Sequence, residues 1–346
     1  MRCINISNIV KLNEKTENRI IIIGAAGHQG FEYYNILKGR FNIVAVVDSD
    51  KALLNERYKN ENVLKCISAE TVPVDFDIAI VCVPHTMHSK VAVPLLQAGK
   101  TVIKEKPLAT SIEESDLYSD NMNLFTIVQR QFNPMFVLGR EKMKEIGRIY
   151  NYNYTYSLPF SEITKGWRAD FNISQGGVLL DMGYHVLDIL LTYFGVPIAV
   201  EGFQSYCYPE MKIQHLEDSI SILMLHENGV QGTININRHS TQKSEIFKIL
   251  GENGSIRVEP KTLEMYNRKG DLKYSKKLSD DVNPKLDMLV EYIENIGNKE
   301  YLKKHLMHHK MMVDVITRIY SKARKIAWAQ LHLNTPIGRV QESSEQ

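Results

Sequence analysis

An aspartate and a histidine four residues apart have the residue types and the spacing for acid–base chemistry. Asp181 and His185 lie in an apolar segment that predicts a helix beginning near Gly177, and positions i and i+4 share one face of a helix. A carboxylate that orients an imidazole and stabilises its protonated form makes the histidine a suitable general base for a hydroxyl proton. The alternative is a buried Asp/His pair with a structural role only.

A glycine-rich segment between an apolar run and a helix pattern has the composition of a phosphate-binding turn. Glycines at such a position let the backbone approach a pyrophosphate at the helix N-terminus. The spacing here is G-x-x-G-x-x-G rather than G-x-G-x-x-G, so a merely structural tight turn is the alternative. The candidate cofactor residues in this turn are Gly24, Ala26, Gly27, His28, Gln29 and Gly30.

Asp48 identifies the cofactor that this turn would hold. It ends the next apolar run and stands 18 residues after Gly30, close to the spacing of about 20 residues expected for the carboxylate that binds the adenosine ribose. Asp48 would repel a 2′-phosphate, and the following Ser49-Asp50-Lys51 lacks the arginine of an NADP site. The pattern therefore predicts NAD, with NADP less favoured.

A further apolar run ends in Val83 and Pro84 and is followed by His85 and His88. At the carboxyl end of a parallel strand these four residues would lie over the cofactor. Whether either histidine takes part in the chemistry stays open, since each could instead cap the helix or pack.

The elements that must position these groups predict an α/β protein. Continuous apolar runs indicate parallel strands covered on both faces; they lie at 20–23, 41–47, 76–83, 101–104 and 124–129, with helices at about 29–38, 88–98, 111–121 and 134–145. Period-two patterns then indicate a mostly antiparallel, open sheet with hairpin turns at Gly229 and Gly254; they lie at 148–157, 198–208, 218–226, 229–239 and 244–258. Helices at about 177–194, 283–297 and 302–328 would cover one face of that sheet, and the other face would be left for self-association.

Four parts of the chain follow from these patterns. We expect an N-terminal extension (1–18), an NAD-binding Rossmann domain with a parallel sheet (19–130), a C-terminal α+β domain for substrate binding and oligomerisation (131–330) and a tail (331–346).

Composition excludes several other classes of protein. The formal charge of +2, from 42 basic and 40 acidic side chains, provides no field to hold a nucleic acid, and no run approaches the roughly 20 apolar residues of a membrane span. Four separated cysteines fit a reduced cytoplasm. His305, His308 and His309 share a helical spacing that could bind a metal, but their lysine-rich surroundings favour a solvated face, so no metal is expected.

The segment AGKTVIKEKPLA at 98–109 resembles the AGKxVxxEKPLA segment of the glucose-fructose oxidoreductase / inositol dehydrogenase (Gfo/Idh/MocA) family. The resemblance continues through His88 to Ala92, Phe132-Asn133-Pro134, Trp167-Arg168 and GGVLLDMGYHVLD at 176–188, so it covers both domains. It implies that Glu105, Lys106 and Pro107 lie beside the nicotinamide, that the Lys106–Pro107 bond is cis, and that Lys106 stabilises charge on the substrate oxygen. It also places general acid–base work on His185, supported by Asp181.

The expected activity is hydride transfer between NAD and a secondary alcohol or ketone of a sugar, inositol or sugar nucleotide. The predicted substrate-binding residues are Arg130, Asn133, Tyr156, Trp167, Arg168, Asp181 and His185, a mixture of aromatic and hydrogen-bonding groups that suits a polyhydroxylated ring. An imine or tetrapyrrole reductase on the same fold and a non-catalytic NAD-binding sensor are the alternatives. We expect a homodimer or homotetramer.

Overall fold

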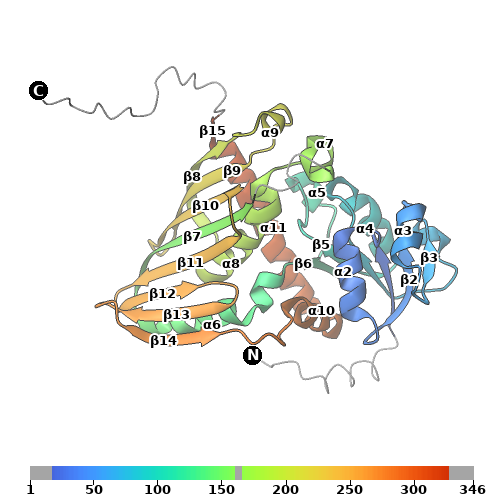
Figure 1. Ribbon diagram of the computed structural model, residues 1–346, viewed down its shortest axis with the longest axis horizontal. Coiled ribbons are helices and arrows are strands. Elements are labelled where there is room, and N and C mark those ends of the chain that lie inside the picture. The colour runs from blue at the N-terminus through green and yellow to red at the C-terminus, as the bar shows by residue number, and fades with distance from the viewer. Residues whose placement is uncertain (1–17, 160–165, 327–346) are drawn as a thin grey trace, which may run out of the picture.

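The computed structural model describes residues 18–159 and 166–326, so the predicted tail, and the predicted extension apart from Asn18, lie outside the described residues. The described chain forms two sheets that stand side by side, with helices between and around them (Figure 1). The first sheet comes from the N-terminal part of the chain and the second from the remainder.

The first sheet has six parallel strands in the order β3-β2-β1-β4-β5-β6, which is the Rossmann order. The strands are β1 (Arg19–Ile23), β2 (Asn42–Val47), β3 (Leu64–Cys66), β4 (Ile78–Val81), β5 (Thr101–Glu105) and β6 (Leu124–Ile127). The prediction of a parallel Rossmann sheet is confirmed. β3 was not predicted, because its three residues LKC form no continuous apolar run and two of them are exposed at the edge of the sheet.

Helices cover both faces of this sheet. They are α2 (His28–Leu37), α3 (Lys51–Arg57), α4 (His88–Gln97) and α5 (Ile112–Ser115), with 3₁₀ turns η1 (Ala69–Thr71), η2 (His85–Met87) and η3 (Gln129–Phe132). α5 is much shorter than the predicted helix over 111–121. Beyond it Leu117 and Tyr118 bond to carbonyls three residues back, and the buried Tyr118 ring leaves the helical path for the core.

The second sheet has nine strands in the order β14-β13-β12-β11-β7-β10-β9-β8-β15 and is antiparallel except at β7–β10 and β8–β15. The strands are β7 (Ile149–Pro159), β8 (Pro197–Ser205), β9 (Ser219–His226), β10 (Gln231–Ser240), β11 (Ser244–Gly251), β12 (Gly254–Val258), β13 (Thr262–Asn267), β14 (Leu272–Lys277) and β15 (Arg324–Ile326). The expected mostly antiparallel sheet is confirmed, and so are the hairpins at Gly229 and Gly254.

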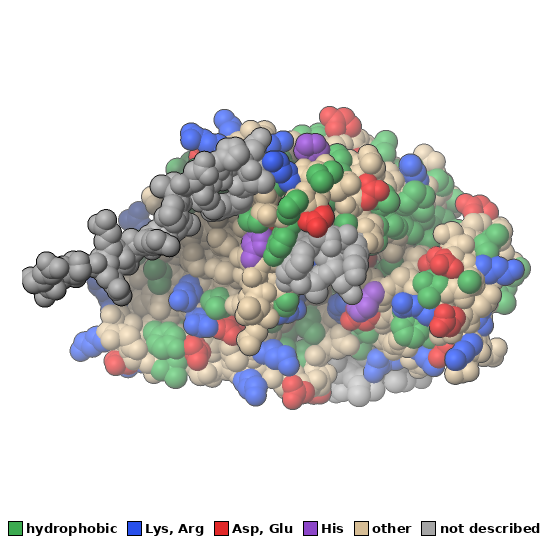
Figure 2. Space-filling model, turned by 45° about the horizontal axis from the view of Figure 1, so that its top comes forward, with side chains coloured by type: hydrophobic (Ala, Val, Ile, Leu, Met, Phe, Trp, Pro, Cys, Tyr) green, Lys and Arg blue, Asp and Glu red, His purple; other side chains and the backbone are tan. Residues whose placement is uncertain are grey.

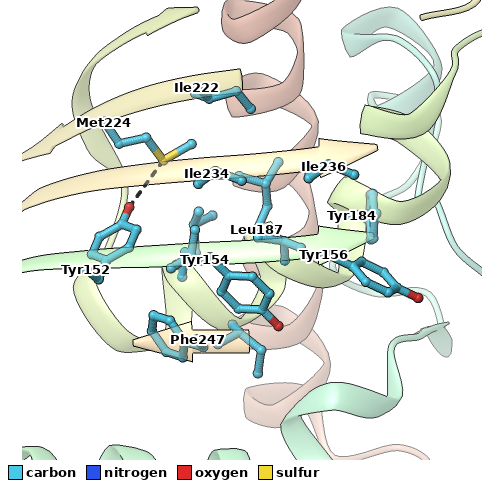
Figure 3. Packing of buried hydrophobic residues seen from close by; sticks show 14 of the residues in the cluster. Tyr152, Tyr154, Tyr156, Tyr184, Leu187, Ile222, Met224, Ile234, Ile236 and Phe247 are labelled. Atoms are coloured by element: carbon cyan, nitrogen blue, oxygen red, sulfur yellow. Dashed lines mark hydrogen bonds between the residues drawn. The ribbon is translucent and has the colours of Figure 1, made fainter. Parts of the chain in front are cut away.

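The central strand β7 shows how the period-two pattern builds the second core. Tyr152, Tyr154 and Tyr156 are buried on one face while Asn151 and Asn153 are exposed on the other. The three rings line up along the strand against β9, β10 and β11 (Figure 3), and the ring of Tyr154 lies 4.9 Å from that of Phe247. The opposite face carries no helix from the described residues.

The helices of the second half do not all cover this sheet. They are α6 (Pro134–Lys142), α7 (Phe171–Ser174), α8 (Tyr184–Phe194), α9 (Pro209–Ile213), α10 (Pro284–Glu294) and α11 (Lys299–Lys322), with 3₁₀ turns η4 (Met143–Ile146) and η5 (Trp167–Ala169) and the π-turn η6 (Leu179–Gly183). The prediction for α10 is wrong: its Met288, Leu289 and Tyr292 pack in the Rossmann core. α11 contributes to both cores, with Leu302 in the first and Met312 in the second.

Within the described residues, one segment could cross a membrane by length and composition alone. An 18-residue window within Phe171–Phe194 has a mean hydropathy of 1.2, but 72% of that window is buried inside the protein, where α8 packs beneath the second sheet. It is therefore a core segment. Among the described residues on the face shown in Figure 2, basic and acidic side chains are interspersed.

Candidate active site

The glycine turn after β1 is a cradle with room for backbone only. Gly24 has φ +78°, and a Cβ there would lie 2.5 Å from the carbonyl oxygen of Cys82; a Cβ on Gly30 would lie 2.4 Å from that of Gly24. Gly27 is the N-cap of α2 and brings no side chain to the helix end, so the N–H groups of the first turn remain available to an anion. The turn therefore fits a dinucleotide pyrophosphate despite its irregular spacing.

Asp48 stands at the rim of this cradle. Its Oδ2 accepts a hydrogen bond from the amide of Ala26 at 2.9 Å, and its Oδ1 accepts one from the amide of Asp50 at 3.0 Å. These two bonds fix the carboxylate at the end of β2, next to the turn that would hold the pyrophosphate. The glycine turn and Asp48 are therefore close in space, as their spacing in the sequence predicts.

The two histidines after β4 are buried and bonded to other groups of the protein. His88 is buried, with Nε2 donating to the carbonyl of Val83 (3.0 Å) and Nδ1 accepting from Lys104 Nζ (3.1 Å). His85 is also buried; its Nδ1 bonds to the carbonyl of Ser174 (2.7 Å), and burial together with the charge of Lys106 lowers its pKa to about 3. Protein groups therefore hold both rings, and their contact with the cofactor stays a prediction. The amide of Val83 lies beside the glycine turn, 3.1 Å from a Cβ placed on Gly24.

A cavity of about 440 Å³ opens between the two halves of the molecule. Both halves contribute to its wall, and most of the lining side chains are polar or charged. They are Gln29, Tyr33, Glu105, Lys106, Gln129, Tyr156, Leu158, Gly166, Trp167, Arg168, Asp181, Met182, His185, Arg238 and Lys285. The cavity thus gathers the predicted Gln29, Glu105, Lys106, Tyr156, Trp167, Arg168, Asp181 and His185.

Lys106 is held at this cavity by the second domain. The Lys106–Pro107 bond is cis, and Nζ donates to the backbone oxygen (2.7 Å) and to Oδ1 (2.6 Å) of Asp181. The other carboxylate oxygen of Asp181 accepts from Arg238 and lies 3.4 Å from Arg168 Nε. Burial by itself would raise the pKa of the Asp181 carboxyl, but the three cations hold it well below its usual value.

The predicted hydrogen-bonded pair of Asp181 and His185 is wrong. The carboxylate of Asp181 is taken by cations from three other segments, and Nδ1 of His185 is buried without a hydrogen-bond partner among the described residues. Burial, followed by the positive charges of Arg130 and Lys106, holds the pKa of His185 well below its ordinary value. His185 therefore presents a neutral imidazole at the cavity, with Nε2 as the nitrogen available to a ligand.

The segment that carries Asp181 is anchored by a buried glutamate. Glu217 accepts from the amides of Gly177 (3.1 Å) and Leu179 (2.9 Å), which are otherwise free at the start of a helix. Burial raises the pKa of Glu217 to about 6. A Cβ on Gly177 would lie 2.0 Å from the Glu217 carbonyl oxygen, which accounts for the glycine. The π-turn that follows is of the kind often found at functional sites.

Arg130 and Asn133 do not line this cavity, and their contact with the substrate stays a prediction. Arg130 makes a double hydrogen bond with Glu245 at 2.9 and 2.8 Å. Asn133 caps α6 through the amide of Met135 and donates to the carbonyl of Pro260. Both side chains are largely buried, and their hydrogen bonds connect the 130–133 segment to Glu245 and Pro260 in the second domain.

The three histidines of α11 do not form a solvated face, so that expectation is wrong. His305 accepts from the amide of Thr126 at 2.8 Å, and His309 pairs with the hydroxyl of Tyr184 at 3.1 Å. His308 lies 2.9 Å from the buried carboxylate of Asp188. Each imidazole therefore bonds to a group of the protein along the junction between the two cores.

Sequence reasoning missed several residues of the cavity wall: Tyr33, Gln129, Leu158, Gly166, Met182, Arg238 and Lys285. One of them had a detectable signal. In β10 the residues Ile234 and Ile236 are buried, and period-two alternation places Arg238 on the same inward face, where a charge needs a buried partner. Lys285 on α10 bonds to Gln29 and Glu32. It reaches the site only through tertiary packing, so no local sequence pattern indicated it.

The Rossmann strand order, the glycine cradle with Asp48 and the polar cavity shared with a second domain define a two-domain nicotinamide-dinucleotide-binding protein. The family described as "Oxidoreductase family, NAD-binding Rossmann fold" matches residues 18–120, and the GFO/IDH/MocA C-terminal domain matches residues 142–257. The chain belongs to the GFO/IDH/MocA oxidoreductase family.

Curated relatives carry names of sugar dehydrogenases. Levoglucosan dehydrogenase of Pseudarthrobacter phenanthrenivorans is 28% identical over 214 residues, and D-glucoside 3-dehydrogenase of Escherichia coli is 28% identical over 211 residues. These alignments cover 53% and 57% of this chain, and 55% and 59% of the two relatives. The chain therefore spans little more than half the length of these curated relatives.

Solved structures share the fold over most of the chain. Levoglucosan dehydrogenase in complex with NADH has a TM-score of 0.77 at 18% identity, covering 88% of this chain and 96% of that one. The myo-inositol 2-dehydrogenase of Lactobacillus plantarum has a TM-score of 0.72 at 17% identity, with coverage of 88% and 98%.

Proposed function

We propose that this protein is an NAD-dependent dehydrogenase that oxidises a secondary alcohol of a sugar, inositol or sugar nucleotide, or reduces the corresponding ketone. The observation that carries the proposal is the Lys106 ammonium, which Asp181 holds at a polar cavity that is also lined by the neutral imidazole of His185. A cavity wall of aromatic and charged side chains suits a polyhydroxylated ligand, and the curated relatives are named for such substrates.

The roles of the chain's own residues follow from this geometry. NAD, when bound, supplies the ring that exchanges hydride with the substrate carbon. The Lys106 ammonium donates to the reacting oxygen and stabilises the negative charge that develops on it. His185 Nε2 accepts the hydroxyl proton in the oxidation and returns it in the reduction. Asp181 positions Lys106 rather than His185, since it bonds to the ammonium through two oxygens.

Asp48 supports NAD over NADP in this proposal. Its carboxylate is fixed next to the glycine turn by the amide of Ala26, where it suits the ribose hydroxyls and repels a 2′-phosphate.

The test is a turnover screen combined with cofactor titration. Purified protein is titrated with NADH and NADPH by nicotinamide fluorescence and then assayed for NAD⁺ reduction with sugars, inositols and sugar nucleotides. Lys106→Met should lower kcat by about 100-fold or more while NADH still binds. Lys90→Met, on the exposed side of α4, is the matched control. NADH binding without turnover of any alcohol or ketone would reject the proposal, as would full activity of Lys106→Met.

We also propose that the protein self-associates through the open face of the second sheet and works in the cytoplasm. Exposed Phe203 and Leu223 lie on this face, next to apolar grooves of about 470 and 490 Å³, and the cysteines in the described part of the chain are free. Light scattering should give a dimer or tetramer that Leu223→Glu dissociates, whereas Ile67→Glu on the Rossmann domain does not. A wild-type monomer would refute self-association.

A further inference from the structure

A cysteine, an aspartate and a histidine meet where three neighbouring strands of the second sheet end. Cys207 follows β8, Asp218 precedes β9 and His239 lies near the end of β10. Because β9 pairs antiparallel with both of the other strands, these three positions share one edge of the sheet. The Sγ atom, a carboxylate oxygen and an imidazole nitrogen all lie within 4.8 Å of one another.

The carboxylate of Asp218 is only half used by the protein. Asp218 is completely buried, and its Oδ2 accepts from the amides of Cys207 and Tyr208, both at 2.9 Å. Its Oδ1 is buried and accepts no hydrogen bond of good geometry from the described residues, although His239 Nε2 lies 3.2 Å away. The hydrogen bonds to the backbone at Cys207 and Tyr208 account for the burial of Oδ2. They do not account for the second buried oxygen, which has a thiol and an imidazole close by but no well-aligned hydrogen bond among the described residues, and such an arrangement is costly.

We propose that Cys207, Asp218 and His239 bind a divalent metal ion of the zinc class, with water as the fourth ligand. A thiolate, an imidazole and a carboxylate are the ligands that Zn²⁺ takes in proteins, whereas Mg²⁺ and Ca²⁺ prefer oxygen ligands alone. The two negative charges of the thiolate and the carboxylate match the charge of the ion.

The spacing of the ligand atoms fits this ion. Usual zinc–ligand distances in a tetrahedral site correspond to separations of roughly 3.3 to 3.6 Å between ligand atoms. The 3.2 Å between His239 Nε2 and Asp218 Oδ1 is already close to this range, and no separation in the cluster, all within 4.8 Å, must shorten by more than about 1.5 Å. Cys207 and His239 are exposed, so their side chains can turn and the ion can enter from solvent.

Binding would change the protonation of the thiol. A thiol with an ordinary pKa of about 8.5 is mostly protonated at neutral pH. The sulfur–metal bond forms as the S–H bond breaks, and the proton goes to the buffer. Each bound ion should therefore release one proton.

The site lies beside the cleft but is not part of it. None of the three side chains lines the 440 Å³ cavity, yet the amide of Arg238 donates to the carbonyl of Asp218 at 3.0 Å, and the Arg238 side chain bonds to Asp181. A metal ion here would brace the backbone that carries Arg238, which gives the site a structural role.

Cobalt binding by the full chain tests the site without any enzyme assay, so its outcome is independent of the proposed dehydrogenase activity. Protein stripped with a chelator is titrated with Co²⁺, and Zn²⁺ is then added in competition. One equivalent of Co²⁺ should give the visible bands of a tetrahedral site and a near-ultraviolet thiolate charge-transfer band. Proton release, measured with an indicator dye, should be one per ion.

Two variants locate the site. Cys207→Ser should abolish the charge-transfer band, and His239→Gln should weaken Co²⁺ binding by at least about 10-fold. Both side chains are exposed, so the fold should survive, as circular dichroism can verify. Cys66→Ser is the matched control and should leave the spectrum unchanged. The absence of a charge-transfer band, or a band that persists in Cys207→Ser, would overturn the proposal.

Discussion

Lys104 lies fully buried at the end of β5, directly behind the loop that carries Lys106. Its Nζ donates to the carbonyl of Pro107 at 2.6 Å and to His88 Nδ1 at 3.1 Å. Burial lowers the pKa of Lys104 from 10.5 to about 7, and the nearby acidic charges of Glu114 and Glu105 only partly oppose this shift. A neutral amine keeps both hydrogen bonds, because it still has two N–H groups.

This depressed pKa predicts how stability depends on pH. Below about pH 7 the ammonium is present in the folded and the unfolded chain, and the cost of burying it is fully felt. As the pH rises through 7, folded Lys104 loses its proton while the unfolded lysine keeps it until about pH 10, so the free energy of unfolding increases. One pKa unit corresponds to about 1.4 kcal/mol, so Lys104 alone should add about 2 kcal/mol between pH 7 and 9.

Lys104→Met removes this titration while preserving most of the side-chain volume. Urea unfolding of the wild type and the variant at pH 6, 7, 8 and 9 should show the wild type gaining about 2 kcal/mol on the variant between pH 7 and 9. Lys90→Met, exposed on α4, should follow the wild type throughout. Parallel pH profiles for Lys104→Met and wild type would refute the reasoning, since the buried amine would then carry no shifted pKa.

Three further predictions concern the site. Gly24→Ala should abolish NADH binding and lower the midpoint of thermal unfolding, because its Cβ would lie 2.5 Å from a carbonyl oxygen. Gly39→Ala has a similar φ of +72° but open space around the Cβ, so it should lower the free energy of unfolding by only about 1 kcal/mol. Equal effects of the two variants would contradict the close backbone approach at Gly24. Asp48→Ser should weaken NADH binding by about 10-fold or more. It should also reduce the ratio of the affinity for NADH to the affinity for NADPH, and fluorescence titration measures both. Asp181→Asn should reduce kcat by about 100-fold with little change in NADH affinity; an unchanged kcat would show that Asp181 does not position Lys106.

The parallel sheet could be predicted because its strands are continuous apolar runs, such as 20–23 and 101–104, that only a sheet covered on both faces can bury. The second sheet could be predicted where one face is covered, as in β7, whose tyrosines alternate with polar residues. β14 (LKYSKK) could not, because an edge strand with nearly every side chain exposed has no apolar periodicity.

For the site, residues fixed by local geometry were predictable and residues fixed by distant partners were not. The turn at Gly24 and its relation to Asp48 depend on a single strand–helix–strand unit. The partners of Asp181 are Lys106 and Arg238, which lie 75 and 57 residues away in sequence. Helical spacing predicted His185 as the partner of Asp181 instead, because spacing identifies only neighbours on the same helix. It contains no information about charged side chains that other elements bring to the same place.

The course of α11 has a consequence for the order in which this chain can fold during synthesis. The helix has 24 residues, about 36 Å in length; its Leu302 and Leu306 complete the Rossmann core, while its Val315 and Ile319 complete the other. A ribosome delivers this helix last of the described helices. The nucleotide-binding half therefore leaves the exit tunnel with part of its apolar core uncovered, and it becomes a finished domain only after nearly all of its partner has been made. Although its two sheets are separate in sequence, the two halves should fold as a single cooperative unit once α11 has been made.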